Sequence, residues 1–217
     1  MKVAEKFISI NGEGQKAGEL AVFIRFTGCN LNCSYCDTKW ANKTDCPYEE
    51  MTADEIYKYI LSTNVKNVTL TGGEPLLHKN IYDLVKLLSE DDSLSVEIET
   101  NGSVDISEYK ALTNPPSITL DYKSPSSGME NEMLMSNYSF IDSRDTVKFV
   151  CGSIEDLEKA KYIIQNYVKG GKVYISPVFG SIEPKDIVEF MINNNMNNVR
   201  LQLQLHKFIW DPDRKGV

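Results

Sequence analysis

The feature that most constrains the fold of this chain is the alternation of short apolar segments with amphipathic ones. The apolar segments are rich in β-branched and aromatic residues, and turn-forming residues follow most of them, as expected for buried strands. They cover residues 21–26, 67–71, 95–100, 117–121, 146–151, 172–176 and 198–205. Helical patterns begin near residue 53 and cover residues 81–88, 107–112, 157–168 and 184–194. Strand followed by helix, repeated in this way, predicts a parallel sheet that is open or barrel-like.

Local signals support the start of two helices. Thr52 and Glu55 have the spacing of a capping box before a helix. Ser153, three residues before Asp156, is likewise expected to cap the helix with the pattern at 157–168. Residues 1–10 give only a short apolar stretch before a glycine-containing turn. The methionine-rich segment 128–140 is ambiguous between an irregular loop and a short helix.

Length and charge limit the class of protein. A chain of 217 residues is expected to form one domain, residues 1–217, with a core that needs no crosslinks. A net charge of −8 argues against a general nucleic-acid binder and favours a small-molecule substrate. Polar residues alternate through the first ten positions, unlike a signal peptide, and no apolar run is long enough to span a bilayer. We therefore expect a reducing, cytoplasmic setting, where clustered cysteines indicate metal or redox chemistry.

Three of the five cysteines lie within eight residues, directly after the predicted strand 21–26. They are Cys29, Cys33 and Cys36, at the spacing Cys-x3-Cys-x2-Cys. Clustered thiolates bind soft metals or iron–sulfur clusters. Three thiolates leave one iron of a four-iron cluster without a protein ligand, and an open iron can bind and activate a small molecule. The spacing favours a [4Fe–4S] cluster with such an open site.

Two other interpretations of these cysteines stay open at this point. Cys46 could supply a fourth thiolate, which would give a closed, tetrahedral zinc site or an electron-transfer cluster. The three positions also share one face of a helix, where thiols behave as small buried apolar groups, although Gly28, Asn30 and Asn32 disfavour a helix there. Replacing Cys46 by serine separates ligation by four thiolates from ligation by three.

Polar residues gather where the predicted strands end. The carboxyl ends of parallel strands meet at one edge of a sheet, and α/β proteins place their function there. We expect one mouth formed by the cysteine loop and by residues 72–75, 99–102, 121–124, 148 and 176–177. Each of these segments taken alone is also typical of an ordinary turn, because short loops use Gly, Pro, Asn and Ser. The shared edge with the cysteines is what indicates function.

The cysteine motif followed by Gly72-Gly73-Glu74-Pro75 resembles the radical S-adenosylmethionine superfamily. The resemblance implies that the three cysteines hold a [4Fe–4S] cluster, with the methionine part of S-adenosylmethionine on the open iron. It also implies that the backbone of residues 72–74 receives the methionyl ammonium, with the Glu74 carboxylate as a further acceptor. One electron from the reduced cluster would split the sulfonium and give a 5′-deoxyadenosyl radical.

A narrower resemblance covers nearly the whole chain and points to the 7-carboxy-7-deazaguanine synthase family. It rests on Gly12-Glu13-Gly14, Phe23-Ile24-Arg25, Gly28-Cys29-Asn30-Leu31, Cys36-Asp37-Thr38, Glu99-Thr100-Asn101-Gly102, Asp121-x-Lys123-Ser124-Pro125 and Gln204-Leu205-His206-Lys207. The family converts 6-carboxy-5,6,7,8-tetrahydropterin to 7-carboxy-7-deazaguanine by radical ring contraction with loss of ammonia, on the pathway to queuosine. The fold it implies is a shortened, partial version of the radical S-adenosylmethionine barrel.

The same resemblance implies roles for individual residues. Thr38 would bind a Mg²⁺ ion that also meets the substrate carboxylate. The expected substrate contacts are Gly12, Glu13, Gly14, Arg25, His206 and the chain end at Val217. The expected cofactor contacts are Gly72, Gly73, Glu74, Asn101, Lys123, Ser124 and Ser176. No side chain is assigned a catalytic role, because the radical would be generated at the cluster. A flavodoxin as electron donor and a homodimer are the partners that the family implies.

One position departs from the family pattern, because Leu203 stands where a proline would precede Gln204. The nearest rival within the superfamily is a glycyl-radical activase, which has the same cysteine spacing in a short chain but acts on a protein. Cys46 and Cys151 are interpreted as structural thiols.

Overall fold

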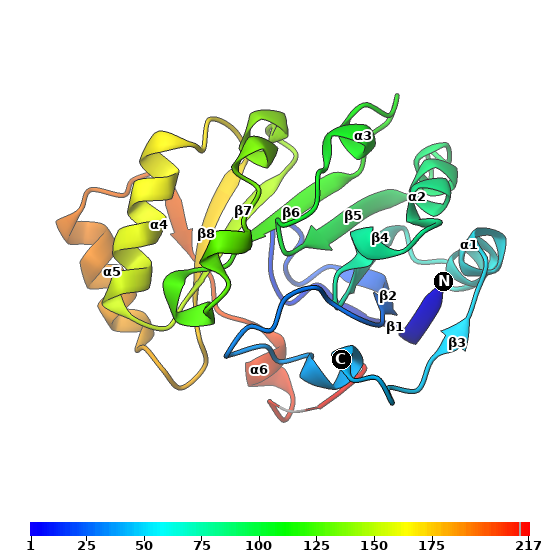
Figure 1. Cartoon of the computed structure of the whole chain (residues 1–217), viewed down its shortest axis with the longest axis horizontal. Helices are drawn as coiled ribbons and strands as arrows, with labels where there is room; N and C mark the ends of the chain where they lie inside the picture. The colour runs from blue at the N-terminus through cyan, green and yellow to red at the C-terminus, as the bar shows by residue number, and fades with distance from the viewer. Residues whose placement is uncertain (213) are drawn as a thin grey trace.

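The computed structural model describes residues 1–212 and 214–217. Its described strands form one nine-stranded sheet in the order β3-β1-β2-β4-β5-β6-β7-β8-β9. All neighbours from β2 to β9 are parallel, whereas β1 runs antiparallel to both β2 and β3. The described sheet ends at β3 on one side and at β9 on the other, so it is a partial barrel that stays open (Figure 1).

The strands agree closely with the sequence prediction. Their bounds are β1 Lys2–Ile10, β2 Leu20–Phe26, β3 Glu49–Glu50, β4 Asn67–Gly72, β5 Ser95–Thr100, β6 Ser117–Tyr122, β7 Thr146–Cys151, β8 Lys172–Pro177 and β9 Val199–Leu201. The predicted strands 95–100 and 146–151 have the observed bounds, and four others differ by one residue at one end. The parallel βα alternation expected from the apolar segments is therefore confirmed.

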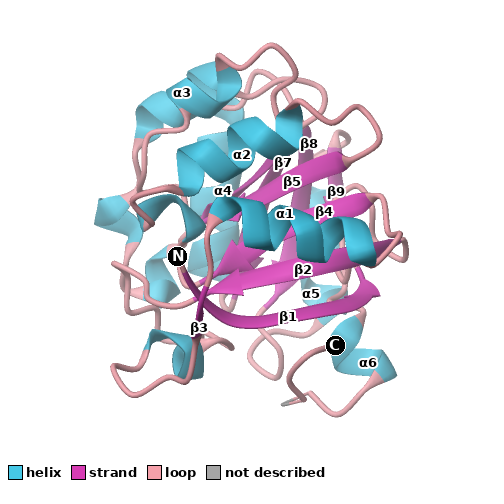
Figure 2. Cartoon of the chain, turned by 90° about the vertical axis from the view of Figure 1, so that its right-hand side faces the viewer, coloured by secondary structure: helices cyan, strands magenta, loops and turns pink. Residues whose placement is uncertain are grey.

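Most helices follow the strands and lie along the outside of the sheet, whereas the last one, which begins at His206, lies near the C-terminus and borders the cavity (Figures 1 and 2). Their bounds are α1 Ala53–Ser62, α2 Ile81–Ser89, α3 Ser107–Lys110, α4 Ile154–Asn166, α5 Pro184–Asn193 and α6 His206–Ile209. The capping box before α1 is present: the Thr52 hydroxyl accepts from the Glu55 amide, and the Glu55 carboxylate accepts from the Thr52 amide. Ser153 likewise caps α4, because its side chain accepts from the amide of Asp156.

Three segments differ from the sequence prediction. Residues 1–10 form a complete strand, β1, whose mixed polar and apolar pattern reflects its partly exposed position beside the edge strand β3. The ambiguous segment 128–140 holds two short 3-10 helices, Glu130–Glu132 and Met135–Phe140. The predicted strand 198–205 is wrong beyond Leu201: the chain leaves the sheet there, and α6 begins at His206.

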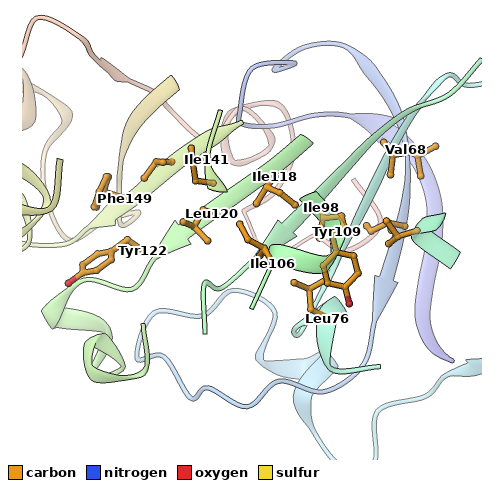
Figure 3. Close-up of a cluster of buried hydrophobic side chains, with 14 of the residues drawn as sticks. Val68, Leu76, Ile98, Ile106, Tyr109, Ile118, Leu120, Tyr122, Ile141 and Phe149 are labelled. Atoms are coloured by element: carbon orange, nitrogen blue, oxygen red, sulfur yellow. The ribbon is translucent and has the colours of Figure 1, made fainter. Parts of the chain in front are cut away.

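Alternation along each strand separates a core face from a polar face. In β6, Ile118, Leu120 and Tyr122 belong to the hydrophobic core, whereas Thr119 and Asp121 point to the opposite side. Figure 3 shows such core side chains from β5, β6 and β7 grouped on the helix-covered face of the sheet. Burying one Ile, Leu or Phe contributes roughly 1.5–3 kcal/mol, so this face supplies most of the stability. The polar face is free to build a site.

Candidate active site

The polar face of the sheet lines a cavity of about 800 Å³. The cysteine loop, the carboxyl ends of several strands and the C-terminal segment all contribute to its wall. The residues predicted from the sequence that line this cavity are Gly12, Glu13, Arg25, Cys29, Cys33, Cys36, Thr38, Gly72, Gly73, Asn101, Lys123, His206 and Val217. The structure thus brings most of the sequence-predicted residues into one space.

The three cysteines lie at one end of this cavity, on the loop that follows β2. Gly28 begins the loop with φ +78°, a left-handed conformation that glycine adopts without strain, and its amide donates to the Ala41 carbonyl at 3.0 Å. Burial raises the pKa of the Cys29 and Cys33 thiols, while nearby Lys123 lowers that of Cys33. A positive charge beside the thiols favours the thiolate form that iron requires.

Cys46 lies apart from this group. Its thiol donates to the Pro47 carbonyl at 3.3 Å, and its charged neighbours are Lys215, Asp45 and Glu5 rather than the other thiols. Cys46 does not line the cavity that the other three cysteines share. Among the described residues, no group of three or more His, Cys, Asp or Glu side chains has the geometry to hold a single metal ion. Three of the five cysteines therefore face the cavity.

The Gly72-Gly73 segment forms the wall beside the cysteines. The Gly73 amide donates to the Phe26 carbonyl at 3.0 Å, and the Glu74 amide donates to the Gly28 carbonyl at 2.8 Å. A Cβ atom at Gly73 would lie 1.8 Å from the Gly28 oxygen, so only glycine fits there. The backbone edge of this motif is consequently held within reach of the cysteine loop, without side chains in the way.

Glu74 does not face the cavity. Its buried carboxylate accepts from the Leu76 amide at 3.1 Å, the Thr100 hydroxyl at 2.9 Å and the Asn101 amide at 2.7 Å. Burial raises its pKa to about 7, although these hydrogen bonds oppose the shift. Its carboxylate joins the ends of β4 and β5 and does not line the space where an ammonium would bind, contrary to the expectation from sequence.

Glu13 and Arg25 also line the cavity. Glu13 accepts from Ser176 Oγ at 2.9 Å and from Gln204 Nε2 at 3.2 Å, and it lies 3.3 Å from Lys148 Nζ. Arg25 Nε donates to Glu5 at 2.8 Å, so the terminal guanidinium nitrogens are the donors left for a ligand. A carboxylate and a guanidinium are thus fixed in place before any ligand binds.

His206, the first residue of α6, lines the cavity near Glu13. A Cβ atom at Gly12 would lie 2.6 Å from its Nδ1, so the imidazole packs directly on the Gly12 backbone. The Leu205 amide donates to the Gly12 carbonyl at 3.1 Å, which ties α6 to this turn. Burial lowers the pKa of His206, while the charges of Glu13 and Asp37 oppose the shift. Leu203 in place of a proline does not prevent His206 from reaching the site.

Two lysines and a carboxylate form a chain of charges from Glu13 to Cys33. Asp121 Oδ2 lies 2.9 Å from Lys123 Nζ and 3.5 Å from Lys148 Nζ, and its Oδ1 is buried with no hydrogen-bond partner among the described residues. Burial alone would raise the pKa of Asp121, but the two lysines together lower it. Burial by itself would lower the pKa of Lys148, but the negative charges of Glu13 and Asp121 raise it well above the usual value. The middle of the cavity therefore stays ionised and offers an acceptor oxygen.

Three further predicted residues, Gly14, Ser124 and Ser176, do not line the cavity. Gly14 exchanges two hydrogen bonds with the Gln202 side chain, at 2.7 and 3.0 Å, and Ser176 supports Glu13. Ser124 is fully buried, with its hydroxyl beside Cys151. Sequence reasoning missed Glu5, which contacts Arg25, because β1 was not recognised as a strand. The alternation in β1 was the signal that could have found it.

Comparisons with known proteins agree with this geometry. Residues 23–191 match the model of the Radical SAM superfamily. A 7-carboxy-7-deazaguanine synthase of Clostridium acetobutylicum is 58% identical over 218 residues, covering 100% of this chain and 99% of that protein. The chain belongs to the radical S-adenosylmethionine superfamily and, within it, to the 7-carboxy-7-deazaguanine synthase family.

A second relative supports the assignment to the 7-carboxy-7-deazaguanine synthase family, and a solved structure shows the shared fold. A synthase of this name from Methanospirillum hungatei is 39% identical and covers 98% of this chain and 86% of its own length. The crystal structure of QueE from Escherichia coli aligns with a TM-score of 0.74 and covers 94% of this chain and 93% of that one. At 24% identity this last likeness shows the shared fold. The radical S-adenosylmethionine family implies a [4Fe–4S] cluster and S-adenosylmethionine, and the three cavity-facing thiols fit such a cluster.

A buried carboxyl group beneath the cavity makes the stability of the protein depend on pH. Burial, followed by repulsion from Glu99, raises the pKa of Glu97 from 4.5 to about 7. Its stabilising contribution is present below pH 4.5 and is lost as the pH rises through 7. We expect Glu97→Gln to be more stable than the wild type at pH 8, by up to roughly 3 kcal/mol. Near pH 4.5 the difference should be small.

Urea unfolding at the two pH values checks this expectation. Glu50→Gln, on the exposed strand β3, controls for the loss of one negative charge. An equal gain for both variants, or a gain of Glu97→Gln at low pH only, would contradict the assigned role of burial.

Proposed function

We propose that this chain converts 6-carboxy-5,6,7,8-tetrahydropterin to 7-carboxy-7-deazaguanine with loss of ammonia, as a carbon–nitrogen lyase of 7-deazapurine and queuosine biosynthesis. The observation that carries the proposal is one cavity whose wall holds three thiols, the Gly72-Gly73 backbone edge, Glu13, Arg25 and His206. The family membership described above supports the same reaction.

The cofactor end of the cavity suits the groups that the superfamily uses. Cys29, Cys33 and Cys36 would hold a [4Fe–4S] cluster, and the Gly72-Gly73 edge would receive the methionyl part of S-adenosylmethionine. Together these groups supply a one-electron cleavage that starts radical chemistry. The unpartnered Asp121 Oδ1 and the lysines beside it offer polar contacts for the rest of the nucleoside.

The other end of the cavity suits a carboxylated pterin. The Glu13 carboxylate is held by Ser176 and Gln204, so it can accept from ring N–H groups without reorganising. The terminal nitrogens of Arg25 can fork onto a carboxylate or carbonyl oxygen. His206 and Val217 also line the cavity and would add further substrate contacts.

We also propose a Mg²⁺ ion bound through the Thr38 hydroxyl. That hydroxyl lies 3.6 Å from Cys36 Sγ and 3.5 Å from the Gly72 carbonyl oxygen, beside both parts of the cofactor end. Thr38→Ala should raise the Mg²⁺ concentration needed for half-maximal rate about tenfold, the effect of about 1.4 kcal/mol of binding free energy. Iron content should not change. Thr38→Ser keeps the hydroxyl and should behave as the wild type, so an unchanged Mg²⁺ dependence in Thr38→Ala would remove this residue from the role.

The remaining expectations from sequence stay part of the proposal. Residues 1–217 would form one domain, in keeping with the single contiguous core. None of the described helices is long and apolar enough to cross a bilayer. We propose a cytoplasmic enzyme that works as a homodimer and receives its electron from a flavodoxin. Nucleic acid is not a proposed partner.

The proposal is tested by anaerobic reconstitution of the cluster, followed by S-adenosylmethionine, Mg²⁺, dithionite and the carboxytetrahydropterin. We expect 7-carboxy-7-deazaguanine, identified by mass and ultraviolet absorption. Slow formation of 5′-deoxyadenosine without this product would retain the radical chemistry and overturn the substrate assignment.

A further inference from the structure

The side chain of Asn101, at the end of β5, is locked in one orientation. Its Oδ1 accepts from the Ser103 backbone amide at 2.9 Å and from the Ser103 hydroxyl at 2.6 Å. A backbone amide can only donate, so the oxygen of the Asn101 side chain must be the atom that faces Ser103. The Asn101 backbone amide is held by Glu74 at 2.7 Å. The Nδ2 group therefore points in one fixed direction.

That direction leads to the cysteine loop. Asn101 Nδ2 lies 3.1 Å from Asn30 Oδ1 and 3.5 Å from Cys29 Sγ, so its two N–H groups have one acceptor each. Asn30 Nδ2 in turn donates to Ser103 Oγ at 2.8 Å, which closes a ring of hydrogen bonds among three residues. Cys29 Sγ also accepts from the Leu31 amide at 3.4 Å. The thiol thus receives two N–H donors.

We propose that Asn101 is a positioning residue that raises the reduction potential of the cluster through its N–H···S hydrogen bond to Cys29. The inference rests on the proposed function, because it takes Cys29 as a cluster ligand. It replaces the expectation that the Asn101 side chain contacts S-adenosylmethionine, since both ends of the amide are already engaged.

The direction of the effect follows from charge. Reduction adds one electron to the cluster and increases the negative charge on its sulfur ligands, so a donor to Cys29 stabilises the reduced form more than the oxidised form. Only part of the energy of such a hydrogen bond to a charged group differs between the two oxidation states. Losing the Asn101 donor should lower the equilibrium constant for reduction about tenfold, which corresponds to a midpoint potential about 59 mV lower.

The test is the midpoint potential of the reconstituted cluster, followed by electron paramagnetic resonance at fixed pH and without S-adenosylmethionine. Asn101→Leu and Asn101→Ser both remove the N–H···S bond, and two variants guard against loss of folding in one of them. Ser103→Ala is the matched control, because it weakens the same ring and leaves the Asn101 amide in place. Iron content and melting temperature are measured for each variant.

We expect a lower potential in both Asn101 variants and a potential close to the wild type in Ser103→Ala. An unchanged potential, with weaker binding of S-adenosylmethionine, would make Asn101 a cofactor ligand and overturn the proposal. The same shift in Ser103→Ala, or failure of both Asn101 variants to fold or hold iron, would show a structural role and overturn it too. A wild-type protein that holds the cluster but makes no product would instead count against the proposed function.

Discussion

Replacing Cys33 by alanine is expected to abolish cluster binding and all activity. Cys33 is buried in the loop wall of the cavity, close enough to Cys29 and Cys36 for their charges to act on one another. With two thiolates left, two of the four irons would lack a protein ligand, and the cluster would not persist. Iron analysis and the visible absorption of the anaerobically reconstituted protein measure the loss.

Cys46→Ser is the matched control for this experiment. Cys46 is equally buried, but it lies apart from the three cavity-facing thiols. We expect Cys46→Ser to bind the same amount of iron as the wild type and to keep its activity. Loss of metal in Cys46→Ser would indicate four thiolate ligands and a closed site, whereas full iron and activity in Cys33→Ala would overturn the ligand assignment.

Glu13→Gln is expected to lower kcat/KM for the pterin about 100-fold. The substitution keeps the shape of the side chain but replaces an anionic acceptor by an amide, which costs one or two charge-assisted hydrogen bonds of about 1.5–3 kcal/mol. It also removes the partner charge of Lys148, 3.3 Å away. Steady-state rates of 7-carboxy-7-deazaguanine formation, measured with dithionite as reductant, give the effect.

Two observations separate a substrate role of Glu13 from a general loss of function. Iron content and the slow cleavage of S-adenosylmethionine in the absence of pterin should match the wild type, because the described contacts of Glu13 are to Ser176, Gln204 and Lys148 rather than to the cysteines. Glu50→Gln, on the exposed strand β3, should keep full activity. If Glu13→Gln lost iron or cleavage to the same extent as kcat/KM, Glu13 would be structural.

Much of the fold could be predicted because its signals are local. The capping box at Thr52 and Glu55 lies within four residues of sequence, and it forms as expected. The strands from β4 to β8 are buried on the helix side and flanked by turns, which is a strong pattern in a parallel sheet. Strand β1 was not predicted, because a partly exposed antiparallel strand has fewer apolar residues in sequence than a buried parallel strand. The strand predicted at 198–205 was too long, since its end depends on docking of α6 against Gly12.

The candidate site could be predicted only as a set of residues near one mouth. Sequence motifs name Glu74, Ser176 and Asn101, but they do not say whether a side chain faces a ligand or another residue. In the structure Glu74 binds backbone and hydroxyl groups of β5, and Ser176 donates to Glu13. These contacts join residues far apart in sequence, from 26 residues for Glu74 and Thr100 to 163 for Ser176 and Glu13. Only the assembled sheet defines them.

We expect the cavity to bring the pterin next to the site where the radical is formed. The most direct measurement uses substrate that carries deuterium at carbon 6 and follows the label by mass spectrometry. If the pterin lies there, 7-carboxy-7-deazaguanine forms and the deuterium appears in 5′-deoxyadenosine, or in S-adenosylmethionine when the cofactor is re-formed after each turnover. Unlabelled 5′-deoxyadenosine, formed at the same rate with and without the pterin, would show that the substrate does not reach the radical, and would contradict the account.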